Sequence, residues 1–276
     1  MPIVTSVHNP HVKDAVRLRN RRYRQRERRI LIDGVRELAR AVAGGVRLRE
    51  VFVCESLCRS EESRRLVDAL PNCGAEVVEV SEAVFEKLAF GQRAEGVLAV
   101  ADMPQRTLAD LKLPARPLLA VLEGVEKPGN VGAVLRSADA AGLSALVVAD
   151  PRTDLWNPNA IRASLGTIFT MGVCQSTTRD ALEWLRQEGL QILAARVHGA
   201  VPYTQPDYCR PTAIVLGSEA AGLTPLWSGD DVLAVRLPML GAADSLNVSA
   251  AAAVLFYEAR RQRDAAAGQP AGGAAN

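Results

Sequence analysis

Short hydrophobic runs alternate with amphipathic stretches along most of the chain. In the C-terminal half the runs are continuous rather than alternating, which is typical of strands in a parallel sheet covered on both faces. They lie at residues 118–122, 145–149, 170–173, 191–195, 212–216 and 232–237. The stretches 131–141 and 179–188 carry apolar residues at helical spacing. The pattern predicts an α/β protein with a parallel sheet in its C-terminal part.

The N-terminal half shows a second alternation, of shorter elements. Strands are predicted at 51–54, 75–80 and 96–101, and helices at 35–43, 61–70 and 81–88, which together favour a compact α/β unit. Residues 104–117 contain three prolines and no clear periodicity. We therefore expect a first domain at 1–103, a linker at 104–117, a second domain at 118–263 and a disordered Ala/Gly-rich tail at 264–276.

The last predicted helix follows a loop of small residues. Ser245 or Asn247 is expected to cap it, because their side-chain oxygens can accept from free N–H groups of the first turn. The expected buried stripe consists of Val248, Ala251, Ala252, Leu255 and Ala259. The loop from Gly241 to Ser245 leaves backbone polar groups beside a helix N-terminus, where a polar ligand can be held.

Composition excludes several classes of protein. The 276 residues carry a net charge of +2 and are 48% hydrophobic, but they contain no apolar run long enough to span a membrane and no secretory signal at the N-terminus. The five cysteines lack paired CxxC spacing, so reduced thiols in the cytoplasm are expected. His8 and His11 have no further ligands near them in the sequence, and no metal site is predicted.

Positive charge is concentrated near the N-terminus. Residues 1–40 contain 11 Lys or Arg against 4 Asp or Glu, and 8 of the arginines fall between Arg17 and Arg29. Such a run can be a solvated helix face, but its density favours contacts with the phosphates of a nucleic acid. The candidate nucleic-acid-binding residues are Arg19, Arg21, Arg22, Arg24, Arg26 and Arg28, with Arg36 and, more weakly, Arg162, which is also a candidate for contact with a pocket.

Two blocks of the C-terminal half carry candidate chemistry. In the first, a helix is expected to begin near Val131 with Asn130 as its cap and Val131, Val134, Leu135 and Ala138 as its buried stripe. Arg136 lies off that stripe, and the plainer interpretation is a single surface arginine. In the second block, Glu219 lies just past the end of the strand at 212–216, where a parallel sheet binds ligands, although an acid there can also be a turn residue. No G-x-G-x-x-G dinucleotide fingerprint is present.

Taken with the last loop and helix, these blocks read N-x-G-x-x-x-R, then L-G-S-E-x-x-G-L, then P-M…S-L-N-V-S-x-A. In order and spacing they resemble the SpoU (TrmH-like) branch of the SPOUT RNA methyltransferases over residues 118–263. The N-terminal half is similar to the accessory domain of that family through Leu31-Ile-Asp-Gly-Val-Arg-Glu37, although the position of Asp33 is commonly Glu. The resemblance implies an L30e-like RNA-binding domain followed by an α/β domain with a deep trefoil knot.

The resemblance also implies an activity and a site. S-adenosylmethionine is expected to be bound by Ala195, Arg196, Leu216, Gly217, Ser218, Leu237, Pro238, Met239, Ser245 and Leu246. The residues implied for methyl transfer to a ribose 2′-hydroxyl are Arg136, Asn130, Glu219, Asn247 and Ser245. An arginine is a poor base, so we expect Arg136 to clamp a phosphate and stabilise the developing alkoxide. The implied partners are RNA, ribosomal rather than transfer RNA, and a second copy of the chain.

Other functions remain open at this point. A relative acting on transfer RNA would share the same motifs. A catalytically silent RNA-binding relative is disfavoured because all five implied catalytic residues are present. A nucleotide-binding oxidoreductase is disfavoured because no phosphate-binding glycine loop follows the first strand of the sheet.

Overall fold

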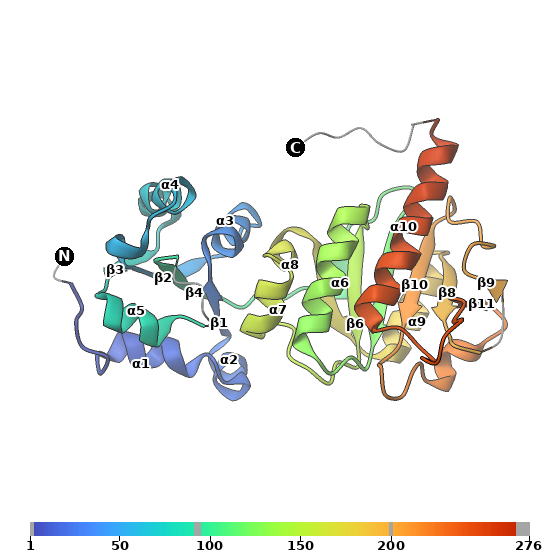
Figure 1. Ribbon diagram of the computed structural model, residues 1–276, viewed down its shortest axis with the longest axis horizontal. Coiled ribbons are helices and arrows are strands. Elements are labelled where there is room, and N and C mark those ends of the chain that lie inside the picture. Colours follow the sequence, from blue (N-terminus) through green and yellow to red (C-terminus); the bar gives the residue numbers. More distant parts are fainter. Residues whose placement is uncertain (1–2, 91–94, 199–200, 269–276) are drawn as a thin grey trace. The chain divides into compact units, whose positions relative to one another are not determined.

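The computed structural model describes residues 3–90, 95–198 and 201–268 (Figure 1). It divides into two compact units, the first made of residues 1–105 and 156–170 and the second of residues 106–155 and 171–276. The first unit is therefore discontinuous in sequence, unlike the contiguous division expected above. The returning segment carries buried apolar side chains, among them Trp156 and Phe169, whose rings stack with centroids 6.0 Å apart.

The first unit contains a mixed four-stranded sheet with the order β1-β4-β2-β3. The β4 strand runs antiparallel to β1 and β2, and β2 is parallel to β3. Its strands are β1 (Arg29–Asp33), β2 (Leu48–Val53), β3 (Glu76–Glu79) and β4 (Val97–Asp102). Its helices are α1 (Pro10–Arg17), α2 (Arg21–Glu27), α3 (Val35–Ala43), α4 (Glu61–Ala69), α5 (Glu82–Leu88), α7 (Pro158–Ala163) and α8 (Thr167–Thr170).

The basic N-terminal segment forms two helices, α1 and α2. Helix α1 ends at Arg17, and Asn20 caps α2 by accepting from the N–H of Arg22 over 2.9 Å. An Asn favours such a new start because its side chain satisfies an N–H that would otherwise lack a partner. The α2 helix stops where Arg28 adopts a left-handed conformation with φ 54°.

The second unit contains a seven-stranded sheet with the order β7-β6-β5-β10-β8-β11-β9, in which every pair is parallel. Its strands are β5 (Leu118–Glu123), β6 (Ala145–Ala149), β7 (Gly172–Ser176), β8 (Gln191–Ala195), β9 (Val201–Pro202), β10 (Thr212–Leu216) and β11 (Val232–Arg236). Its helices are α6 (Pro128–Ala141), α9 (Thr178–Gln187) and α10 (Val248–Ala266). The expected class is confirmed: a parallel-sheet α/β unit preceded by a smaller α/β unit.

Burial explains why the central strands contain few polar residues. Every residue of β5, β6 and β10 is buried, as both faces of a parallel sheet require. Helices α6 and α10 pack side by side (Figure 1). Because the strands are parallel, the loops that follow β5, β8, β10 and β11 leave the sheet at the same edge, where ligands bind in such folds.

Two helix boundaries differ from the sequence-based expectation. Helix α6 begins at Pro128, with Lys127 at the cap position, so Asn130 lies inside its first turn instead of capping it. Proline is favoured there because an N–H at this position would find no acceptor within the helix, so its absence costs nothing. At the other end of the unit, α10 continues to Ala266, so residues 264–266 are helical; residues 269–276 of the expected tail lie outside the described part of the chain.

Capping by Asn247 is confirmed, since its Oδ1 accepts from the N–H of Ser249 over 3.0 Å. Four of the five predicted stripe residues of α10 are buried and Ala251 is half-buried. None of the helices in the described part of the chain is long and apolar enough to cross a membrane.

Candidate active site

A cavity of about 470 Å³ opens at the edge of the second unit where β8, β10 and β11 end. It is lined by residues 195–198 after β8, residues 216–223 after β10, and the loop from Leu237 to Leu246 that leads into α10. Val248, Ala251 and Leu255 of α10 form a further apolar wall. The cavity is thus built from loops far apart in sequence, as its position at the ends of parallel strands predicts.

The structure brings nine of the ten expected cofactor-binding residues to this cavity. They are Ala195, Arg196, Leu216, Gly217, Ser218, Leu237, Met239, Ser245 and Leu246. Pro238 is the exception, because it does not contribute to the lining. The apolar members can surround a flat base, and the backbone of the loops supplies polar groups.

The loop after β10 is closed on itself. The N–H of Gly222 donates to the carbonyl of Ser218 over 2.9 Å, and the N–H of Ala221 donates to Ser218 Oγ over 3.1 Å. Glycine is required at 217, because a Cβ there would collide with the backbone of Gly222. The loop thereby presents a fixed edge of backbone to the cavity.

Three of the implied catalytic residues meet beside the cavity. Asn130 Nδ2 on α6 donates to Glu219 Oε1 over 3.0 Å, and the side-chain amide of Asn247 donates to the same oxygen. The other carboxylate oxygen, Oε2, lies 3.2 Å from Lys127 Nζ. Ser245 lines the cavity itself. The first turn of α6, the loop after β10 and the N-terminus of α10 therefore form one polar network.

Glu219 is held as a carboxylate by this network. Burial raises its pKa, but the Lys127 ammonium, the Asn130 amide and the N–H of Val248 outweigh burial and hold the pKa below its ordinary value. A carboxylate that accepts several hydrogen bonds favours the charged form. Glu219 is consequently a fixed acceptor at neutral pH rather than a proton donor.

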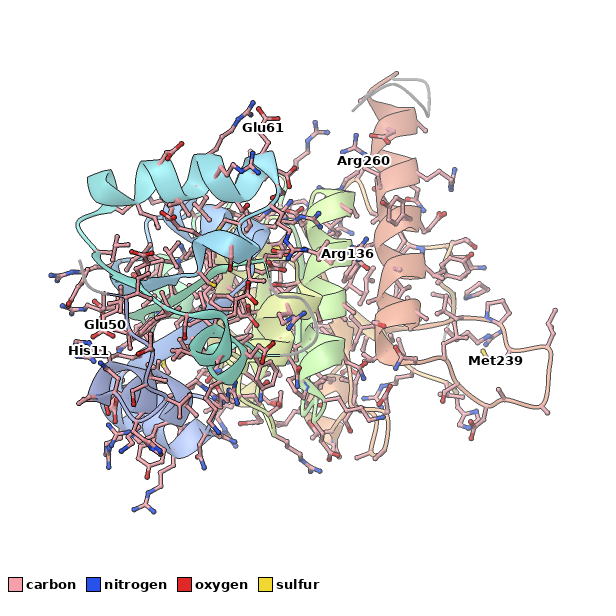
Figure 2. The ribbon with its side chains drawn as sticks, turned by 60° about the vertical axis from the view of Figure 1, so that its left-hand side comes forward. His11, Glu50, Glu61, Arg136, Met239 and Arg260 are labelled. Atoms are coloured by element: carbon pink, nitrogen blue, oxygen red, sulfur yellow. The ribbon has the colours of Figure 1, made fainter. Side chains whose placement is uncertain are left out.

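Arg136 is not part of this network within the chain. It is exposed on α6, does not line the cavity, and forms no hydrogen bond or ion pair with another residue in the described part of the chain. In Figure 2, α10 lies between α6, which carries Arg136, and the loop that carries Met239. The single chain therefore leaves this guanidinium free to contact another molecule.

The basic segment contains both buried and exposed arginines. Arg24 is 1% exposed and donates through Nη1 to the carbonyls of Leu18 and Arg19, so the expectation that it contacts RNA is corrected: it supports the turn between α1 and α2. Arg19 is half-buried and donates to the carbonyls of Lys87 and Ala89. The candidates for RNA contact that are exposed are Arg21, Arg22, Arg26, Arg28 and Arg36.

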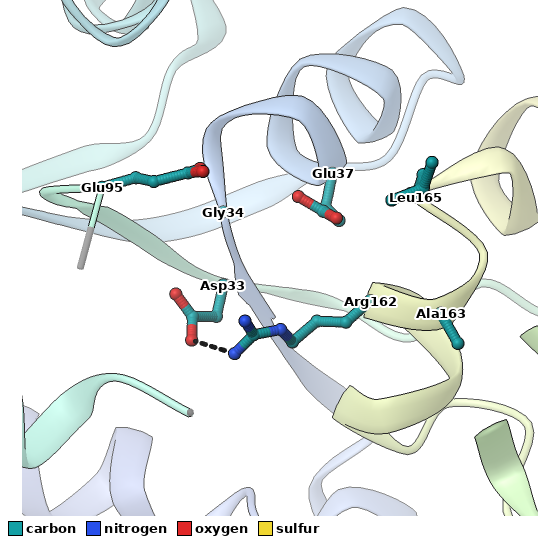
Figure 3. Close-up of a pocket in the computed structure, with 7 residues that line it drawn as sticks. All are labelled: Asp33, Gly34, Glu37, Glu95, Arg162, Ala163 and Leu165. Carbon is teal, nitrogen blue, oxygen red and sulfur yellow. Dashed lines mark ion pairs between the residues drawn. The ribbon is translucent and has the colours of Figure 1, made fainter. Parts of the chain in front are cut away.

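Arg162 lies in the first unit and contacts Asp33 (Figure 3), with Nη1 3.5 Å from Oδ2. Burial raises the pKa of Asp33 to about 6, although the N–H of Phe90 and the Arg162 guanidinium both lower it. The two residues line a cavity of about 290 Å³ together with Glu37 and Glu95. Arg162 thus has a partner inside the protein, which weakens it as a candidate for RNA contact.

One group of potential metal ligands was missed from the sequence. His11 Nδ1 lies 3.3 Å from Glu50 Oε1 (Figure 2), and Glu76 lies beside them on the neighbouring strand. Sequence spacing gave no sign of this group because β2 and β3 bring the two glutamates to α1. Glu50 is half-buried, and the group is brought together only by the packing of α1 on the sheet.

Two residues of the second unit were also missed. Lys127 had no sequence signal apart from its place in the block before Asn130. Glu123 did have a sequence signal, because it is an acid at the end of a fully buried strand, where an isolated charge is costly.

The structure therefore combines a parallel-sheet unit, which has a cavity at the edge where its strands end, with a smaller unit that contains the basic N-terminal segment. Residues 117–257 match the model of the SpoU rRNA Methylase family, and residues 9–99 match that of the MRM3-like substrate binding domain. The chain belongs to the SpoU rRNA methylase family.

Several similar proteins match almost the whole chain. The 23S rRNA (guanosine(2553)-2′-O)-methyltransferase RlmP of Bacillus subtilis is 29% identical over 94% of this chain and all of its own length. A crystal structure of an RNA 2′-O ribose methyltransferase is 41% identical, with a TM-score of 0.83 over 95% of this chain and 99% of the other. The AdoMet-bound rRNA methyltransferase from Sinorhizobium meliloti is 28% identical, with a TM-score of 0.85 over 94% and 97%.

Proposed function

We propose that this protein transfers a methyl group from S-adenosylmethionine (AdoMet) to a ribose 2′-hydroxyl of ribosomal RNA. The observation that carries the proposal is the cavity at the ends of β8, β10 and β11 with the Asn130–Glu219–Asn247 network beside it. Two of the similar proteins named above are 2′-O-methyltransferases of RNA, and the third is an rRNA methyltransferase crystallised with AdoMet.

The residues of the cavity fit AdoMet. The cavity volume of about 470 Å³ lies within the range of small-molecule sites, which is roughly 300–1,000 Å³. Leu216, Leu237 and Leu246 provide apolar walls for adenine, while Asp244 and the backbone of the loop at 217–223 provide polar partners. When bound, the cofactor supplies an electrophilic methyl group on a sulfonium.

The protein must also align the ribose 2′-oxygen with that methyl group and stabilise the negative charge that develops on this oxygen. Alignment of two reactants in a near-attack geometry supplies a large part of such a rate enhancement. We assign Asn130, Glu219 and Asn247 to orientation of the sugar and of a guanidinium. Arg136 clamps the adjacent phosphate and stabilises the developing alkoxide, and phosphate or water takes the proton from the 2′-oxygen.

Arg136 reaches the site from a second copy of the chain. It does not line the cavity of its own chain, and it is exposed. The outer face of α10 and the loop before it expose Leu240, Leu246, Val254 and Tyr257, which are large apolar side chains that a homodimer contact would cover. In such a dimer one subunit supplies the cavity and the other supplies the guanidinium.

A complementation experiment tests whether Arg136 is required for methyl transfer and whether it acts from the partner subunit. Arg136→Ala is expected to lose methyl transfer to ribosomal RNA while binding AdoMet within a few-fold of the parent. Gly217→Ala keeps Arg136 but distorts the cavity loop, and it is expected to lose AdoMet binding. Co-expression of the two variants restores one intact site in each mixed dimer. If the mixture stays as inactive as either variant alone, Arg136 does not act in trans.

The first unit is assigned to RNA binding through its exposed arginines. Its match to a substrate-binding domain model and the basic charge of residues 1–40 support this role. A ribosomal RNA substrate is present where ribosomes are assembled, so we place the protein in the cytoplasm. Methylation of total RNA with labelled AdoMet, followed by mapping of the modified nucleotide, tests whether the substrate is ribosomal RNA. Label in transfer RNA alone would overturn this assignment.

A further inference from the structure

Glu123 is a buried acid next to the proposed AdoMet site but outside the cavity lining. It is the last residue of β5 and is 3% exposed. Within residues 3–90, 95–198 and 201–268 it forms no ion pair, and its hydrogen-bond partners are the uncharged donors of two threonines. Burying a carboxylate is costly unless hydrogen bonds compensate, so these donors must be well placed.

The two threonines belong to different elements. Thr178 Oγ1, at the start of α9, donates to Glu123 Oε1 over 2.8 Å. Thr224 donates twice, from Oγ1 to Oε1 and from its backbone N–H to Oε2, each over 2.7 Å. Glu123 therefore holds Thr224 with both of its oxygens, whereas it holds Thr178 with one.

Thr224 ends the loop that forms the cavity edge. The start of this loop is fixed by β10, and its middle is closed by the hydrogen bond between Gly222 and Ser218. Residues 216–223 line the cavity and Thr224 does not. The contact with Glu123 is thus the attachment of the far end of the loop to the sheet.

The same threonine is held from a second direction. Arg196, which lines the cavity after β8, directs Nη2 to the carbonyl of Thr224 over 3.4 Å, to the carbonyl of Trp227 over 3.1 Å and to Ser228 Oγ over 3.0 Å. The N–H and the C=O of Thr224 are therefore both bound, by side chains from the ends of two different strands. An element fixed in this way is preorganised for a ligand.

We propose that Glu123 is a positioning residue for the cofactor: through Thr224 it fixes the loop at 217–223 in the conformation that binds AdoMet. The inference rests on the proposed function, since it assumes that AdoMet occupies this cavity. Glu123 does not touch the cofactor and takes no part in proton transfer. The alternative is a purely structural role, in which the carboxylate only joins β5, α9 and the loop.

The two threonines provide a matched pair for separating these roles. Thr178→Val and Thr224→Val are nearly isosteric, and each removes one hydroxyl from the same acceptor oxygen. Thr178 is 1% exposed and Thr224 is exposed. A purely structural role predicts that Thr178→Val is the more damaging variant in every measurement, because loss of a buried hydrogen bond costs more.

The experiment measures the AdoMet dissociation constant by calorimetry and the melting temperature of the full-length variants. We expect Thr224→Val to raise the dissociation constant about tenfold, the effect of losing one hydrogen bond to a charged group. Thr178→Val should leave it within about twofold while lowering the melting temperature more. Thr224→Ser, which keeps the hydroxyl, should restore the parental affinity.

Equal changes of affinity in the two valine variants would overturn the inference, as would an unchanged affinity in Thr224→Val. The proposed function fails by a different result, namely that the parent protein itself does not bind AdoMet. Steady-state kinetics provides a second readout: a positioning role raises KM for AdoMet in Thr224→Val and leaves kcat near that of the parent.

Discussion

Asn130 and Glu219 are 89 residues apart in sequence, yet Asn130 Nδ2 donates to Glu219 Oε1 over 3.0 Å. The contact joins the first turn of α6 to the loop after β10. Asn247 completes it from α10 and at the same time caps that helix. One asparagine therefore has a structural task and a task in the site, and the two can be separated.

Asn247→Asp should separate them. An aspartate keeps the oxygen that accepts from Ser249 and caps α10, so stability is expected to stay within about 0.5 kcal/mol of the parent. It loses the amide donor to Glu219 and places a second carboxylate beside it, so kcat should fall at least tenfold at neutral pH. Asn247→Ala is the comparison and should lose both activity and about 1 kcal/mol of stability. Parental turnover in the aspartate variant would remove Asn247 from the site.

Lys127→Met should change the pH dependence of methyl transfer. Burial raises the pKa of Glu219, while Lys127 is the largest of the groups that lower it, so removing the ammonium raises this pKa. If ionised Glu219 is required, activity is present above its pKa and lost as the pH falls through it. The acidic limb of the kcat profile therefore moves to higher pH. Arg152→Met is the control, since it removes a cation from the neighbouring exposed pair with Glu126 and leaves Glu219 untouched. Equal shifts in both variants would refute the assignment.

The exposed arginines of the first unit should determine the salt dependence of RNA binding. Replacing Arg21, Arg22 and Arg28 by alanine is expected to reduce the slope of log K against log salt by about two to three, because each phosphate contact contributes roughly 0.7–0.9. Arg24→Met is the counterpart: its guanidinium is buried, so stability should fall while the slope persists. An unchanged slope in the triple variant would mean that these arginines are only a solvated face.

Asp33 should make the protein less stable as the pH rises. Burial raises its folded-state pKa from 3.8 to about 6, so the folded protein binds the proton more tightly than the unfolded chain. The stabilisation is complete below about pH 4 and is lost as the pH rises through about 6, a change of at most roughly 3 kcal/mol. Asp33→Asn does not titrate, so urea unfolding of the parent relative to this variant should show a decline between pH 4 and pH 7. A flat difference would show that Asp33 titrates normally.

Local patterns predicted the elements of the second unit well. The strands 145–149, 191–195 and 212–216 have the predicted bounds, because strands in the middle of a parallel sheet are covered on both faces and are mostly apolar. Boundaries set by caps were less certain. Asn247, one of the two predicted caps of the last helix, does cap it, but Asn130 does not cap α6, since this helix begins at Pro128, three residues before the predicted start at Val131.

Arginine positions show the limit of sequence reasoning more clearly. Eight arginines between residues 17 and 29 suggested a uniform basic surface, but the turn between α1 and α2 buries Arg24 against backbone carbonyls. Arg162 likewise faces Asp33. Guanidinium groups in a charge run look alike in the sequence, and only the packing of the chain decides which of them remain at the surface.

The sequence by itself determined the alternation of strands and helices, the basic N-terminus and the motifs that lead to the family, because periodicity, charge and residue order are local properties. Only the tertiary structure decided which side chains meet. It brought Asn130, Glu219 and Asn247 together, joined Glu123 to Thr224 and left Arg136 outside its own cavity. Such contacts depend on the order of strands in the sheet and on the paths of the loops between them, and no short stretch of sequence contains that information.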